Sequence, residues 1–206
     1  AGGPDRHSTV EGETHMNIGF AFCGSFCTYA QVFPVFEALS KSHRVIPIFS
    51  AASAATDSRF GLAKDFMARA ASITGMTPLT TLEEVEPIGP KGLLDLLVIA
   101  PCTGNTLVKL AHSVADGPVT MAAKSQLRNG RPILLALSTN DALAGAAENI
   151  GRLLPRRHYY FVPFRQDNWV KKPTSMVADF SLIPDAVDAA LVGQQLQPIL
   201  LPGEPT

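Results

Sequence analysis

The chain has 206 residues, of which 46% are hydrophobic and 17% charged, and its formal net charge is −1. This length suits one domain with one buried core, and the composition excludes disorder for most of the chain. A nearly neutral chain without basic runs gives no reason to expect a nucleic-acid partner. No apolar stretch approaches the roughly 18–20 residues that span a bilayer, so we expect no membrane insertion.

The predicted elements alternate between strand and helix. In chain order, the pattern predicts a strand over 17–23, a helix to about 42, a strand over 43–49, a helix from about 59, a strand over 94–100, helices over 105–114 and 119–128, a strand over 132–137, a helix over 140–154, a last short strand over 159–163 and a closing helix over 184–196. This alternation predicts an α/β fold, a three-layer doubly wound parallel sheet of flavodoxin or Rossmann-like type.

The two ends of the chain differ in character from this core. Residues 1–15 are polar and non-periodic and precede an apolar strand, so we interpret them as a cloning leader, disordered or non-native, with Met16 as the natural start. They have no apolar segment of the kind that signal peptides carry. We expect a single domain over 16–197, a long irregular connection over 77–91, and a fraying tail over 198–206.

The cysteines exclude two classes of small stabilised domain. Cys23, Cys27 and Cys102 are odd in number and lack zinc-ligand spacing, which argues against both a disulfide framework and a structural metal. We therefore expect reduced, packed thiols in a cytoplasmic protein, and no metal site.

Small polar residues follow the predicted strands, where ligands bind in doubly wound sheets. These loops span 24–28, 50–59, 101–106, 138–141 and 164–175. Hydroxyl groups and exposed N–H groups at helix starts favour a phosphate, although any one such loop also suits ordinary capping and turns. The G-x-G-x-x-G and G-x-x-x-x-G-K-[ST] motifs are absent, and no histidine lies in a predicted site loop. The loops together predict a phosphorylated small-molecule cofactor.

One of these loops carries a family resemblance. The segment PCTGNT at 101–106 resembles the P-A-S-A-N-T motif of the homo-oligomeric flavin-containing cysteine decarboxylases, and the resemblance covers about 17–143. It implies FMN as cofactor and a homo-oligomer, a trimer or a multiple of one. It also implies a set of cofactor-binding residues: Gly24, Ser25, Thr28, Ser50, Thr103, Gly104, Asn105, Thr106, Ser138 and Asn140. Asn105 would be the catalytic residue, as an uncharged donor and acceptor.

Two departures separate the chain from those decarboxylases. Pro87 stands where the family places its catalytic histidine, and proline cannot transfer a proton. The family's substrate clamp is replaced by ALSTNDAL at 136–143. In this segment only Asn140 matches the family's motif. Decarboxylation of a peptidyl cysteine is therefore disfavoured.

Further segments resemble one branch of this superfamily, which supplies one component of a two-component oxidoreductase of sporulating bacteria. They include DGPVTMAAK, LRNGRP, LSTNDAL, YYFVPF and KKPTSMVA. The resemblance implies oxidation of a hydroxylated tetrahydropyridine dicarboxylate to pyridine-2,6-dicarboxylate in the cytoplasm, with an A subunit as partner and NAD(P) bound through that partner.

A dicarboxylate substrate would need cations, and the candidates are Arg59, Arg165, Lys171 and Lys172. Of these we predict Arg59, Lys171 and Lys172 as substrate-binding residues, Arg59 first because its guanidinium can grip a carboxylate bidentately. The two lysines also suit a merely solvated loop. No residue is decisive as the general base, for which Glu86 and Asp141 are candidates. Two alternatives stay open: an accessory, non-catalytic subunit with a vestigial flavin site, and a stand-alone flavin-dependent decarboxylase or prenyltransferase.

Overall fold

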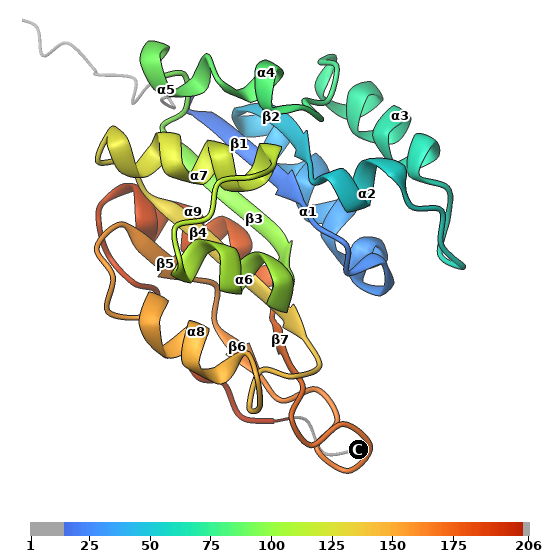
Figure 1. Ribbon diagram of the computed structural model, residues 1–206, viewed down its shortest axis with the longest axis vertical. Helices are drawn as coiled ribbons and strands as arrows, with labels where there is room; N and C mark the ends of the chain where they lie inside the picture. Colours follow the sequence, from blue (N-terminus) through green and yellow to red (C-terminus); the bar gives the residue numbers. More distant parts are fainter. Residues whose placement is uncertain (1–14, 204–206) are drawn as a thin grey trace, which may run out of the picture.

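A computed structural model describes residues 15–203 (Figure 1). Within this range seven strands form one sheet, in the order β2-β1-β3-β4-β7-β6, with β5 also paired to β4. The strands are β1 (Asn17–Phe22), β2 (Arg44–Phe49), β3 (Leu96–Cys102), β4 (Ile133–Thr139), β5 (Tyr159–Phe161), β6 (Phe164–Arg165) and β7 (Met176–Ala178). The leader expected over 1–15 lies, except for His15, outside the described residues.

The sheet has a parallel body and a small antiparallel extension. Strands β2, β1, β3, β4 and β5 run parallel, which is the 2-1-3-4-5 order of flavodoxin-like folds. The outer edge of β4 is shared, because β5 pairs with its first half and β7 pairs antiparallel with Ser138 and Thr139. The predicted three-layer, mostly parallel sheet is confirmed, as an open sheet.

Helices cover both faces of this sheet (Figure 1). One face carries α1 (Tyr29–Ser42) and α9 (Ile183–Leu191), and the other carries α6 (Gly104–Ala111), α7 (Pro118–Arg128) and α8 (Ala147–Leu153). The short α2 (Ala51–Ala55) and the longer α3 (Ala63–Thr74) lie beside β2, while α4 (Leu82–Val85) and α5 (Ile88–Lys91) contact α7. No helix in residues 15–203 is long and apolar enough to cross a bilayer.

An aromatic cluster fixes the position of the first site loop. Phe22, at the end of β1, is fully buried, and its ring stacks on Phe33 and Phe49 at centroid distances of 5.0 and 4.8 Å. Each such pair contributes about 0.5–1.5 kcal/mol beyond area burial. Because Phe33 belongs to α1 and Phe49 to β2, the cluster holds the ends of β1 and β2 and the start of α1 together.

The largest departures from the predicted elements concern the connections. Residues 51–55 form the short helix α2, and the next helix begins only at Ala63, whose backbone N–H donates to Asp57 Oδ1. The connection over 77–91 contains α4, which a capping box at Thr81 and Glu84 starts, and α5. Residues 140–146 are turns, and helix α8 starts after them.

The chain after β5 also differs from expectation. The strand at 159–161 is not the last, because β6 and β7 follow as a short antiparallel pair. Residues 199–201, expected to fray, instead pair with β6: Phe164 N–H donates to the carbonyl of Ile199, and Leu201 N–H donates to the carbonyl of Phe164. Short-range sequence pattern predicts neither pairing, because both depend on partners distant in the chain.

Candidate functional site

The fold has its switch point between β1 and β3. The chain leaves β1 toward α1 on one face of the sheet, and leaves β3 toward α6 on the other. Doubly wound sheets bind ligands at this point, outside the carboxyl ends of the strands. A cleft of about 490 Å³ opens there, which lies within the usual range for small-molecule sites.

Four loops form the wall of this cleft, which we call the switch-point cleft. They follow β1, β2 and β3 and precede α7. The lining residues are Cys23, Gly24, Ser50, Ala51, Ala52, Thr103, Asn105, Thr106, Lys109, Asp116, Gly117, Pro118, Val119 and Thr120.

The loop after β3 owes its shape to two threonines and a glycine. Thr103 caps α6, because its Oγ1 accepts a hydrogen bond of 3.3 Å from the backbone N–H of Thr106. Thr106 in turn donates through Oγ1 to Cys23 Sγ at 3.3 Å, which ties the loop to β1. At Gly104 a Cβ would lie 2.8 Å from Thr139 Oγ1 and 3.0 Å from Asp141 Oδ1. A side chain at position 104 would push against these two side chains, so glycine gives α6 its close approach to the end of β4.

A second helix begins at the opposite wall. Gly117 precedes α7, Pro118 occupies its first turn, and the backbone N–H of Gly117 donates to Thr120 Oγ1 at 3.2 Å. Helices α6 and α7 thus both begin at the cleft wall, and the start of a helix carries partial positive charge. Ser50 adds a hydroxyl from the end of β2. This set of uncharged donors suits an anionic group.

The titratable groups of the cleft are few. Lys109 Nζ donates to both carboxylate oxygens of Asp116, at 3.0 and 2.9 Å, and this hydrogen bond lowers the pKa of Asp116. Burial raises the pKa of the Cys23 thiol to about 11, so this sulfur stays protonated and uncharged at neutral pH. Among the described residues of the cleft, no histidine and no unpaired acid is available as a proton acceptor.

Comparison with known proteins shows the family of this chain. A family model described as Flavoprotein matches residues 6–155. The B subunit of dipicolinate synthase of Bacillus subtilis (strain 168) is 44% identical over 185 residues, which are 89% of this chain and 92% of that protein.

The chain belongs to the Flavoprotein family.

Its similarity to the B subunits of dipicolinate synthase extends to solved structures. The crystal structure of the B subunit of dipicolinate synthase from Bacillus halodurans C has a TM-score of 0.84 and 41% identity, covering 92% of this chain and 97% of that one. The FMN-dependent cysteine decarboxylase SpaF shares the fold, with a TM-score of 0.60 and 21% identity, covering 87% and 97% of the two chains. Within the Flavoprotein family, the chain therefore groups with the dipicolinate synthase B subunits.

Half of the ten cofactor-binding residues that the sequence predicted line the cleft. They are Gly24, Ser50, Thr103, Asn105 and Thr106. Gly104 sits among them at the start of α6, and Asn105, the predicted catalytic residue, is exposed. Their role in binding a cofactor stays a prediction.

The other four predicted cofactor residues do not line the cleft. Ser25 Oγ and Ser138 Oγ lie 2.7 Å apart and hydrogen bond to each other. Thr28 is buried and donates to the carbonyl of Ser25 at 2.8 Å. Asn140 is exposed at the end of β4, where its side-chain oxygen accepts a 3.4 Å hydrogen bond from Ser175. The chain turns away from the cleft at Ser25 and continues into α1, whereas Ser138 and Asn140 lie at the end of β4, on the far side of β3 from β1.

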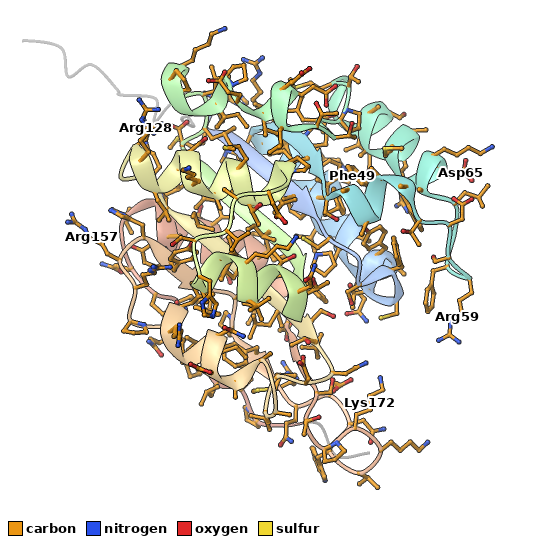
Figure 2. The ribbon with its side chains drawn as sticks, in the orientation of Figure 1. Phe49, Arg59, Asp65, Arg128, Arg157 and Lys172 are labelled. Atoms are coloured by element: carbon orange, nitrogen blue, oxygen red, sulfur yellow. The ribbon has the colours of Figure 1, made fainter. Side chains whose placement is uncertain are left out.

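The three cations predicted to bind substrate also lie away from the cleft. Figure 2 shows Arg59 and Lys172 at the ends of two separate loops that extend from the body of the molecule. Arg59 is exposed, and its guanidinium lies over the ring of Phe60. Lys172 pairs with Asp167 at 3.6 Å, and Lys171 is exposed beside it. None of the three lines the cleft, and their role in binding a substrate stays a prediction. Neither candidate base, Glu86 or Asp141, lines the cleft either.

Sequence reasoning missed the second wall of the cleft, from Lys109 to Thr120. The sequence did carry a signal, because Gly117-Pro118 is a typical start for a helix, but no pattern indicates that this start faces the ends of β1 and β2. The crossover from α6 to α7 decides that placement.

A second hollow lies on the other side of the same edge of the sheet, and we call it the α1 groove. It has a volume of about 670 Å³ and lies between the start of α1 and the β6–β7 pair. Its charged lining residues are Arg165, Asp167 and Asp179, and Arg165 forms an ion pair of 2.6 Å with Asp179. Cys27 and Thr28 form part of its α1 side.

Proposed function

We propose that this chain is the B subunit of a dipicolinate synthase and that it binds FMN in the switch-point cleft. The observation that carries the proposal is the cleft itself: about 490 Å³ at the β1/β3 switch point, with α6 and α7 both beginning at its wall. The proposal is supported by the 44% identity to a dipicolinate synthase B subunit and by the FMN-dependent relative that shares the fold.

The residues of the cleft suit a phosphorylated flavin. Gly24 leaves its backbone open to a ligand, since a Cβ there would have no neighbour closer than 3.9 Å, and Ser50 offers a hydroxyl beside it. These groups, with the helix starts, would hold the phosphate. Thr103 and Asn105 would hydrogen bond to the polar edge of the ring.

In the proposed reaction, a hydroxy-tetrahydrodipicolinate loses its hydroxyl group as water and gives up two electrons and two protons, which yields dipicolinate, pyridine-2,6-dicarboxylate. A bound flavin supplies a two-electron acceptor. The chain's own contribution is positional: the Asn105 amide orients the reacting ring by donating and accepting hydrogen bonds without carrying charge, and Cys23 and Val119 give part of the wall an apolar surface. Formation of an aromatic ring favours the oxidation. NAD(P) would enter through the A subunit, in the cytoplasm, with this chain as a homo-oligomer.

One observation favours a second candidate, an accessory subunit that holds a ligand without performing chemistry. In the described part of the cleft the one carboxylate, Asp116, is engaged by Lys109, which leaves no evident proton acceptor. In that case the A subunit performs the redox step. A stand-alone decarboxylase is disfavoured, because Pro87 occupies the position of the family's catalytic histidine and begins the short helix α5.

Titration of FMN into the purified chain, followed by flavin fluorescence, tests the binding proposal. We expect saturable quenching that Asn105→Ala weakens up to about tenfold, the effect of losing one or two hydrogen bonds. Gln194→Ala, which truncates an exposed amide beyond the end of α9, is the matched control and should leave binding unchanged. Absence of quenching in the wild-type chain would refute the flavin site.

Assay with and without an A subunit separates the candidates. Dipicolinate formation that needs both chains and is abolished by Asn105→Ala supports a catalytic role for this chain. Formation that survives this substitution supports the accessory role, and formation by this chain alone would show that the A subunit is not required.

A further inference from the structure

Lys109 and Asp116 are the charged pair of the switch-point cleft. Among its described lining residues, Lys109 is the one cation and Asp116 the one anion. Lys109 belongs to α6, whereas Asp116 lies in the loop that leads to α7, so the pair joins two walls of the cleft. Both oxygens of Asp116 accept from Lys109 Nζ, at 3.0 and 2.9 Å.

This pair is held loosely enough to be exchanged. The side chains of Lys109 and Asp116 are 33% and 53% exposed. Ion pairs this open to water contribute little to stability, because solvent screens the attraction and both side chains lose freedom in forming the pair. A competing anion in the cleft could therefore draw the ammonium away from Asp116 at small cost. The four-carbon stem of lysine gives Nζ the reach to move.

We propose that Lys109 is the residue that recognises the anionic end of the ligand, and that Asp116 holds its ammonium in place until that anion binds. The inference rests on the proposed function, in which the ligand is a phosphate monoester of a flavin. A phosphate monoester carries about −1.5 to −2 charges at neutral pH, against one for the carboxylate, and offers more acceptor oxygens. The phosphate would also lie near the starts of α6 and α7, whose partial positive charge Asp116 does not fully balance.

The pairing makes Lys109 a specificity residue. With Lys109 held by Asp116, the described lining of the cleft has no net side-chain charge, so an uncharged ligand gains nothing from the lysine. A phosphorylated ligand gains a charge-assisted hydrogen bond, which is stronger than a neutral one. Lys109 would therefore decide between FMN and riboflavin, which differ in the phosphate and share the ring.

Affinities for FMN and riboflavin, measured by fluorescence titration on the same variants, test this role. Lys109→Met should weaken FMN binding about tenfold or more and leave riboflavin binding unchanged within about twofold. It should also flatten the salt dependence of FMN binding, because the attraction it removes is the screened one. Lys124→Met is the control: Lys124 is exposed on α7, does not line the cleft, and carries the same charge.

Asp116→Asn separates recognition from a structural role. If Asp116 competes with the ligand, this variant should bind FMN as tightly as the wild-type chain or more tightly, with riboflavin binding unchanged. If the pair merely pins the loop before α7, Lys109→Met and Asp116→Asn should both weaken the two ligands to the same extent, and that result would overturn the proposal. A wild-type chain that binds neither flavin would refute the proposed function as well. If Lys109→Met loses affinity for FMN and riboflavin equally, only the role of Lys109 is refuted.

Discussion

The switch-point cleft and the α1 groove flank the same edge of the sheet but offer different chemistry. The groove is the larger, about 670 against 490 Å³, yet its charged lining consists of two aspartates and one arginine, a formal charge of −1. The cleft combines uncharged hydroxyl and N–H donors with one balanced ion pair. A dianionic ligand therefore favours the smaller hollow. Donor type and charge, more than volume, distinguish the two as anion sites.

Thiol labelling gives the largest expected contrast between the two hollows. Cys27 is exposed at the groove, whereas Cys23 is buried at the cleft wall and Cys102 is buried in β3. The raised pKa of Cys23, about 11 against 9.0, leaves about 100-fold less thiolate at neutral pH. We expect one fast-reacting thiol, identified by peptide mass mapping, and labelling of Cys23 that accelerates as the pH rises toward its pKa.

The same labelling reports where a flavin binds. Saturating FMN should leave the rate at Cys27 unchanged, because Cys27 lines the groove and not the cleft. Protection of Cys27 by FMN would contradict the assignment of the ligand to the cleft.

A substitution at Gly104 should disturb the cleft, because this residue begins α6. Gly104→Val would force a Cβ against Thr139 and Asp141, at a cost of about 1–3 kcal/mol, and displace the start of α6. We expect a lower free energy of unfolding in urea and FMN binding weakened at least tenfold. The control is Gly151→Val in α8, where a Cβ meets nothing within 4 Å. Equal FMN affinity in both variants would show that the start of α6 does not contribute to binding.

The smallest expected effect concerns the boundary between the two hollows. Ser25 and Ser138 hydrogen bond across the end of β3, at 2.7 Å. Ser25→Ala and Ser138→Ala should each cost about 1 kcal/mol of unfolding free energy, and the double variant should cost less than their sum, because both remove the same bond. A double-mutant cycle in urea measures this coupling, and strict additivity would mean that the bond contributes nothing.

Local pattern predicted most of the fold. The strands at β1, β2, β3 and β4 fell within one or two residues of their observed bounds because each is an apolar run between turn residues. The β6–β7 pair, by contrast, was missed, because two- and three-residue strands carry too short a pattern to recognise. Their pairing depends on the free edge that β4 presents beyond β5.

The site residues, too, fall into some that the sequence predicted and some that it missed. Gly24, Thr103 and Asn105 were predicted from the rule that ligands bind where parallel strands end, together with the family resemblance. Arg59 and Lys172 were predicted because they are cations in loops that follow predicted strands. Neither lines the cleft, because charge and loop position do not determine where a long loop points. Lys109 and Asp116 were overlooked as site residues because they are seven positions apart on a helix and the loop after it, and only the turn from α6 to α7 brings them together.

The sequence by itself determined the alternation of strand and helix, the caps that start α6 and α7, and the family to which the chain belongs, since these depend on neighbours in the chain or on segments shared with relatives. Tertiary structure alone decided which loops share a wall, which cation enters the cleft, and which serines turn away to bond to each other. The physical reason is that a capping bond closes within a few residues, whereas a binding site is assembled from chain segments whose approach depends on packing throughout the core.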